Sequence, residues 1–566
     1  MLTPNAAPFP FKDRKFNFER RTITPPKRVP HQTATPRQLQ TGLEPYTGAW
    51  NIAAVVHLLK RTTFGASRAH INTLLATNRQ NAIEMLLSTD ITPPPPPVNN
   101  YNNPDLNDPD VSLGQTWINA PFTNDPNIIF ARFISLKGWW HRNMRYQSLH
   151  IIEKLLLFWH NHFATQAAEI FEPRITYRHL QTLRQHAMGN FRQMVRAVTL
   201  DPQMLIYLNG AFNVASAPDE NYARELQELF CIGTGPGSFY TESDVQAAAR
   251  VLTGWTINPF DLSTVFWPPN HDTGNKQFSP FYNNTLIAGQ AGGNGANELD
   301  ELLNMLLNTD ECARFICREL YRFFVYHLID EDTEINVIDP LAQIFRDNNY
   351  DIVPVLRALF NSAHFFDPLN MGAVIKSPVD YLIGQAREFD MPFPPDTLYN
   401  ENWVFAQALE GLLLDFKQAP GDPPDVAGWP AYYQTPQYNK LWITTDSYPR
   451  RLLYTDYMMF AGFNYNDTGV VKIDPIAYAA LLPNPADINA LIDDVCYQFL
   501  SYPITQEVKN QLKAILLSGQ TLDYYWTVAW NFFQDNPTDE GAYLLIFSRL
   551  AGMFRYLLQL EEYQLS

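Results

Sequence analysis

Two histidines lie two residues apart in a run of large apolar side chains. Residues 158–163 read Phe-Trp-His-Asn-His-Phe, so aromatic rings frame His160 and His162. An imidazole removed from water needs a hydrogen-bond partner or a metal ion, and neutral imidazole suits zinc, iron or copper. The pair therefore predicts metal ligands, and the alternative is a buried histidine bonded to a backbone carbonyl. On a helix the two side chains diverge by about 200°, so both reach one site only where the helix ends or unwinds.

Two glutamates repeat this arrangement of charge inside an apolar frame about sixty residues later. Glu225 and Glu228 are three residues apart, which places both carboxylates on one face of a helix. Helical carboxylate pairs occur in carboxylate-bridged metal sites, where a Glu-x-x-His motif accompanies them. Neither that motif nor His-Glu-x-x-His occurs in the chain. We expect a second half of the metal site here, and the alternative is a solvated face on which Arg224 pairs locally.

Four further residues have the chemistry of a catalytic site. His271 and Asp272 are adjacent within a long loop, where the aspartate could orient the histidine as a base or complete a metal site. Arg250 and Arg450 are candidate clamps for an anionic group, because guanidinium binds carboxylate and phosphate through two parallel hydrogen bonds. The alternative for both arginines is a structural ion pair.

The elements that would position these residues are mainly helices. Apolar residues recur at helical spacing through most of the chain, and alternating strand patterns are scarce. We therefore expect a mostly α protein, a large single helical domain with at most a minor β-hairpin. Asp339 is the expected cap of the helix that begins at Pro340. The expected helices include residues 71–87, 128–144, 148–163, 177–189, 191–200, 222–231, 242–252, 297–307, 310–325, 340–348 and 542–560.

Long irregular segments separate some of these helices. Residues 93–97 are five consecutive prolines that open a loop rich in Asn, Asp and Pro. Residues 258–294 and 415–445 are rich in Gly, Pro and aromatic residues, and loops of this length are commonly functional.

We divide the chain into three parts. Residues 1–45 read as a Pro-rich extended arm, residues 46–460 as the helical core that carries the candidate site, and residues 461–566 as a C-terminal helical segment packed on that core. The arm is either a disordered leader or a segment that docks on its own body or on a neighbouring subunit. The second reading predicts a homo-oligomer or another assembly.

Composition excludes several classes of protein. The 566 residues include 41 Lys and Arg against 58 Asp and Glu, a formal net charge of −17. This balance disfavours non-specific binding to nucleic acid, which needs a basic surface. No apolar run is long enough for a transmembrane helix, and the N-terminus lacks the pattern of a classical signal peptide. The four cysteines form no Cys-x-x-Cys pair, so we expect packed thiols.

Six segments together resemble the bacterial domain of unknown function 1800 family. They occur in the same order over about 400 residues, which makes the resemblance specific. The segments are HLLKRTTFGA (57–66), FWHNHFA (158–164), NYARELQELF (221–230), AAARVLTGW (247–255), HDTGNK (271–276) and VAGWP (426–430).

The resemblance implies a largely helical fold and a single family unit, and it implies no established reaction. Members are often encoded beside a sulfatase-like family, which suggests a sulfatase-like partner, and many are exported. The chain departs from those members in lacking an obvious signal. The family's shared positions correspond here to His160, His162, Glu225, Glu228, His271 and Arg250.

Our leading expectation is a metal-dependent enzyme in which a divalent metal sits among these side chains. Hydrolysis is favoured over oxidation because no redox cofactor motif is present. The alternative is a non-catalytic structural or assembly protein, whose buried polar network stabilises the fold and whose arm contacts partner subunits. A third reading is a carbohydrate or peptide binder that uses Trp429, Trp442 and Tyr432.

Overall fold

Short polar side chains start many of the helices. Asn51, Asp125 and Asp539 each accept a backbone N–H in the first turn of the helix that follows, which satisfies one of the donors that a helix leaves unpaired. The computed structural model describes residues 41–90, 92–467 and 469–566. Most of the expected arm over residues 1–45 therefore lies outside the described residues.

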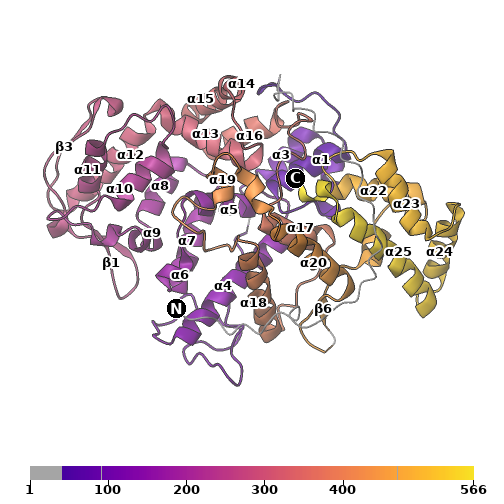
Figure 1. The fold of residues 1–566 in the computed structure, drawn as a ribbon. Coiled ribbons are helices and arrows are strands. Elements are labelled where there is room, and N and C mark those ends of the chain that lie inside the picture. The colour runs from indigo at the N-terminus through magenta and orange to yellow at the C-terminus, as the bar shows by residue number, and fades with distance from the viewer. Residues whose placement is uncertain (1–40, 91, 468) are drawn as a thin grey trace. The chain divides into compact units, whose positions relative to one another are not determined.

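Helices dominate the described residues, which confirms the mostly α prediction (Figure 1). The first group comprises α1 (Ile52–Thr62), α2 (Arg68–Leu75), α3 (Arg79–Leu86), α4 (Pro126–Tyr146), α5 (Ile152–His162), α6 (Ala167–Ile170), α7 (Pro173–His186), α8 (Phe191–Thr199) and α9 (Pro202–Tyr207). The second comprises α10 (Asn221–Glu225), which continues as a π-helical turn (Leu226–Cys231), α11 (Glu242–Val251), α12 (Glu298–Leu307), α13 (Asp310–Phe324), α14 (Glu331–Thr333), α15 (Asp339–Asp347) and α16 (Ile352–Asn361). The third comprises α17 (Pro378–Glu388), α18 (Tyr399–Asp415), α19 (Pro430–Tyr433), α20 (Ser447–Phe460), α21 (Pro475–Ala480), α22 (Ile488–Phe499), α23 (Gln506–Leu517), α24 (Tyr524–Asp535) and α25 (Glu540–Leu558).

The β-structure assigned within the described ranges is small. Three antiparallel pairs are present, and each strand has only two or three residues. The pairs are β1 (Trp255–Ile257) with β2 (Thr264–Phe266), β3 (Lys276–Gln277) with β4 (Leu286–Ile287), and β5 (Phe463–Asn464) with β6 (Val470–Val471). The first two pairs shape the loop that was expected to be irregular over residues 258–294.

Two helix predictions were wrong in detail. The single helix expected over residues 71–87 is interrupted, because the Asn78 side chain accepts the N–H of Asn81 at 2.9 Å and caps a new helix. Asp339 does not cap α15, since a π-helical turn leads into it from Glu334. The Asp339 carboxylate instead receives a 2.6 Å bond from Nε of Arg314.

Helix α5 is the most enclosed element near the candidate site. All of its residues from Glu153 to His162 are buried, a pattern expected of a helix in the centre of a large core. The Trp159 indole donates to the carbonyl of Ala187 at 2.9 Å and stacks on Phe163 and Phe191. In Figure 1, α5 is drawn near the middle of the described fold, next to α7.

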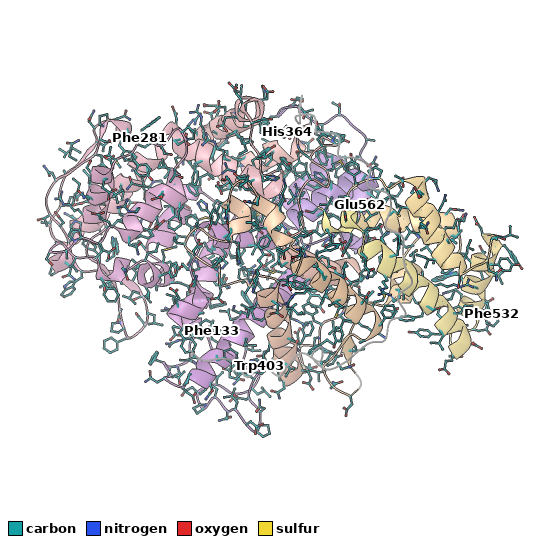
Figure 2. The ribbon with its side chains drawn as sticks, viewed as in Figure 1. Phe133, Phe281, His364, Trp403, Phe532 and Glu562 are labelled. Atoms are coloured by element: carbon teal, nitrogen blue, oxygen red, sulfur yellow. The ribbon has the colours of Figure 1, made fainter. Side chains whose placement is uncertain are left out.

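The C-terminal helices pack against one another and against earlier helices. Helix α25 packs against α20, α21, α23 and α24, and α22 packs against α1. Figure 2 shows Phe532 projecting from α24, where its side chain is 52% exposed. Among the residues that the structure describes, no helix combines the length and apolar character that crossing a bilayer requires.

The close approach of the turn after α1 to α17 yields a stability prediction. Gly65 has a φ of 72°, and a Cβ there would lie 2.9 Å from the backbone of Gly384. Gly292 has a φ of 61° and no atom within 4 Å of that position. Both Ala variants incur the cost of left-handed backbone, about 1–2 kcal/mol, and Gly65→Ala adds a clash worth about 1–3 kcal/mol. Urea unfolding should therefore rank Gly65→Ala as less stable than Gly292→Ala, and equal midpoints would contradict this packing.

Candidate functional site

Helix α5 directs its two histidines to different parts of the protein. Nε2 of His160 accepts the backbone N–H of Gly421 at 3.1 Å. Nε2 of His162 lies 3.0 Å from the carbonyl oxygen of Phe230. The two imidazoles have separate partners, which follows from their spacing on a regular helix.

His160 belongs to a buried polar network. Its ring packs against Trp140 and Trp429 and lies 6.4 Å, between ring centroids, from His179. His179 in turn lies 3.1 Å from Asp201. Burial lowers the pKa of His160 to about 3, and His179 lowers it further. The ring is therefore neutral at physiological pH and holds the main chain of Gly421 in place.

A buried lysine fixes the same segment. Nζ of Lys137 lies 2.5 Å from both Glu410 and Asp422, and Asp422 directly follows Gly421 in the chain. His141 lies 3.5 Å from the second oxygen of Glu410. This network was not predicted, because its members come from distant segments that have no motif in common.

His162 lines a cleft of about 670 Å³. A carbonyl oxygen can only accept, so the bond to Phe230 places the ring proton on Nε2 and leaves a lone pair on Nδ1. The side chain is 7% exposed, and Nδ1 has no hydrogen-bond partner within the described ranges. Burial lowers the pKa of His162 to about 4. The neutral imidazole of His162 can therefore accept a hydrogen bond through Nδ1 from a molecule bound in the cleft.

Three segments that carried the family resemblance meet at this cleft. Asn161 and His162 come from one, Glu228 from another and Ala427 from a third. The Asn161 side-chain oxygen accepts the N–H of Trp429 at 2.9 Å. Gly428, with a φ of 88°, is required beside it, since a Cβ would lie 2.4 Å from that oxygen.

The remaining cleft wall is rich in carboxylates. Its two arginines are already paired: Arg318 lies 2.6 Å from both Glu311 and Glu334, and Arg322 lies 2.5 Å from Glu319. Aromatic rings complete the wall with Phe315, Tyr433 and Tyr438. The sequence did not predict these residues. The spacing of charges along an amphipathic helix such as α13 does not reveal which other segments of the fold its charged face meets.

Of the two glutamates, Glu228 lines the same cleft as His162, and Glu225 is not among the lining residues. Glu228 lines the cleft from the π-helical turn, and π-helical turns recur at functional sites. Burial raises the pKa of Glu225 to about 7, and the charge of Glu228 raises it further. Arg224 pairs instead with Glu220 at 3.0 Å and with Glu242. With this pKa, Glu225 can donate or accept a proton near neutral pH.

His271, Asp272 and Arg250 form a separate cluster. Nδ1 of His271 lies 2.9 Å from the carbonyl of Thr253, and Nε2 lies 3.0 Å from Glu298. Arg250 binds both carboxylate oxygens of Asp272, at 2.7 and 3.0 Å. Both ring nitrogens and the carboxylate are thus engaged within the chain, where they tie the loop over residues 258–294 to α11 and α12.

Arg450 stands apart from both clusters. Its side chain is 46% exposed and lies 3.0 Å from Asp446 and 3.6 Å from Asp415. Across residues 41–90, 92–467 and 469–566, no three His, Cys, Asp or Glu side chains are grouped to hold a metal ion. The four expected metal ligands do not form one coordination shell, and of these four residues His162 and Glu228 line the same cleft.

The buried imidazoles predict sensitivity to acid. Six histidines have pKa values lowered to about 3 or 4, with burial as the first cause: His57, His70, His141, His150, His160 and His162. The unfolded chain binds protons at these groups below about pH 6.5 and the folded chain does not, so stability falls as pH drops from there toward 4. Each group contributes about 1.4 kcal/mol per pH unit.

Circular dichroism across pH 7.5 to 4 checks this expectation. We expect cooperative loss of helix well above pH 4. Glu225, Glu410 and Asp494 have raised pKa values that act in the opposite direction, so they are three carboxyl groups against six histidines. Unfolding free energy that stays constant between pH 7 and 4.5 would show that these rings are not buried as neutral groups.

Comparison with known proteins agrees with the resemblance noted in the sequence. The family described as Protein of unknown function (DUF1800) matches residues 57–565. No curated protein and no solved structure matches the chain. The matched range includes α5, the π-helical turn and the loop that carries Gly421 and Gly428, so all parts of the cleft lie within it. The chain belongs to this family of proteins of unknown function.

Proposed function

We propose that the protein is an enzyme, of hydrolase type, whose site is the cleft at His162. The observation that carries the proposal is that His162, with a neutral imidazole lone pair, lines one cleft with Glu228, whose charge acts on a second carboxyl group, Glu225, with a pKa raised to about 7. Hydrolysis needs one group that removes a proton from water and another that returns it to the leaving group.

Three side chains would divide this work. Glu225 titrates near neutral pH and would transfer the proton. Burial, and then the charge of the cleft-lining Glu228, would keep Glu225 protonated, and Nδ1 of His162 would accept a hydrogen bond from water or from a substrate hydroxyl.

No step of this scheme requires a metal ion. The divalent metal expected from the sequence remains a prediction, and elemental analysis of the purified protein tests it. The sulfatase-like partner implied by the family and assembly through the N-terminal arm also remain predictions.

A second candidate function is structural. It is favoured by the cluster of His271, Glu298 and Lys276, in which Nζ of Lys276 lies 2.5 Å from Glu298 and all three side chains are buried. Such a cluster fixes a fold without doing chemistry. Under this reading the cleft would turn over no substrate, and solution mass would instead reveal an assembly.

Activity measurements separate the two candidates. Purified protein would be assayed from pH 5 to 9 with chromogenic carboxylic, phosphate and sulfate esters and glycosides, with chelator and with added Zn²⁺, Mn²⁺, Mg²⁺ or Ca²⁺. We expect one class to be hydrolysed. The rate should fall about 10²-fold or more in His162→Ala and Glu228→Gln, as for loss of acid–base groups. Glu225→Gln should remove the inflection near pH 7.

Glu301→Gln is the matched control, since Glu301 is an exposed carboxylate on α12. It should keep the full rate and pH profile. Hydrolysis that survives in His162→Ala and Glu228→Gln, or the absence of hydrolysis in every class, would overturn the proposed function.

A further inference from the structure

Helices α4 and α7 pack against each other (Figure 1) and border a second cleft, of about 750 Å³. Asn143 of α4 and Gln147 directly after it are four residues apart, and so are Gln181 and Gln185 of α7. This spacing places each pair on one side of its helix, and all four amide side chains line the cleft. We call it the amide cleft. Its volume falls within the range of about 300–1,000 Å³ that is usual for small-molecule sites.

Several hydrogen-bonding atoms of the amide cleft have no partner among the described residues. Gln147 is 7% exposed, and both Nε2 and Oε1 of its side chain are buried without a hydrogen bond. The same holds for Nδ2 of Asn143, Nε2 of Gln181 and Nε of Arg184. Buried polar groups are nearly always hydrogen-bonded, so five unpaired atoms on the residues of one cleft point to a bound molecule.

The buried charges of the amide cleft are already paired. Both carboxylate oxygens of Glu153 accept hydrogen bonds from Arg184, one of them at 3.1 Å. Burial lowers the pKa of His150 to about 4, and nearby guanidinium groups lower it further, so this ring is neutral at physiological pH. Among the described lining residues, the remaining Asp, Glu, Lys or Arg is Asp90, which is exposed. The cleft therefore favours a ligand without charge.

The unpaired atoms also indicate which neutral ligand fits. Four of them are N–H donors, and Oε1 of Gln147 is an acceptor. A hydroxyl group offers two lone pairs and one proton, so several hydroxyls on one molecule match a wall in which donors outnumber acceptors. Pro93 and Pro94 give the cleft an apolar surface on which the C–H groups of a sugar ring can pack. A saccharide combines these features.

We propose that the amide cleft is a binding site for a neutral saccharide. Hydroxyl oxygens of the sugar would accept from Asn143 and Gln181, and one hydroxyl would donate to Oε1 of Gln147. Trp429 and Trp442, from which the sequence predicted a carbohydrate site, are buried and do not line this cleft. Among the described residues, none lines both the amide cleft and the cleft at His162, so the proposal is independent of the hydrolase activity.

Binding to the full chain tests the proposal. Saturation-transfer difference NMR would screen glucose, galactose, mannose, xylose, N-acetylglucosamine and their disaccharides, and isothermal titration calorimetry would measure each sugar that binds. Phosphate and N-acetyl-trialanine amide are the comparison ligands. We expect saturable binding of one neutral saccharide per chain, and no saturable binding of phosphate or of the peptide. Saturation matters, because sugars at high concentration also stabilise proteins by exclusion from their surface.

Variants assign the binding to the amide cleft. Gln147→Leu removes both unpaired amide atoms and keeps a side chain of similar size. It should weaken the affinity for the saccharide about tenfold or more, the effect of losing two hydrogen bonds. Gln181→Leu should weaken it as well. Gln506→Leu is the matched control, because Gln506 is exposed on α23 and bonds Asn510 at 3.0 Å, and this variant should bind like the parent.

Three results would overturn the proposal. The first is the absence of saturable binding of every saccharide in the screen by the parent chain. The second is saturable binding of phosphate or of the peptide that is tighter than that of any saccharide. The third is affinity equal to that of the parent in Gln147→Leu, or in Gln181→Leu where circular dichroism shows that Gln147→Leu does not fold.

Discussion

Helix α5 carries charged and imidazole side chains through the centre of the core, and each must find a partner there. Glu153 meets Arg184 of α7, with one of their bonds at 3.1 Å, and Lys154 meets Asp380 of α17. His160 holds the main chain of Gly421, and His162 holds that of Phe230. Buried polar groups without partners are costly, so these four contacts fix four distant segments against one helix.

Polar side chains of α5 also line cavities. Lys154 lines one cavity together with Lys60, Arg61 and Arg322, and His162, two turns further along α5, lines the cleft. Arg322 of α13 lines both of them, with Glu319 as its partner. One cavity is therefore rich in cations and the other in carboxylates, although they share a wall.

Local sequence patterns predicted the helices well, because capping residues and apolar spacing act within a few residues. The divergence of His160 and His162 followed from helical geometry alone. The interruption of a helix was harder to predict. At Asn78 the signal in the sequence is the residue itself, whose side chain can either cap a new helix or lie within a continuing one.

The site was only partly predictable. His162 and Glu228 were found from their types and apolar frames, and they do share the cleft. The cluster of His271 and Arg250 looks similar in sequence, yet its groups are bound by Glu298 and Asp272. Whether a buried polar residue meets a partner or a cavity depends on long-range packing. No spacing rule contains that information, and the basic residues of α1, α5 and α13 escaped notice for the same reason.

The central claim is that the two histidines of α5 have different roles: His160 holds the main chain of Gly421, and His162 presents Nδ1 to the cleft. Nitrogen-15 NMR of histidine-labelled protein tests it directly, with a His162→Gln variant for assignment. The account predicts opposite tautomers, with the proton on Nδ1 of His160 and on Nε2 of His162, and no protonation of either ring between pH 8 and 6. The same tautomer in both rings, or protonation of His162 near pH 6.5, would contradict it.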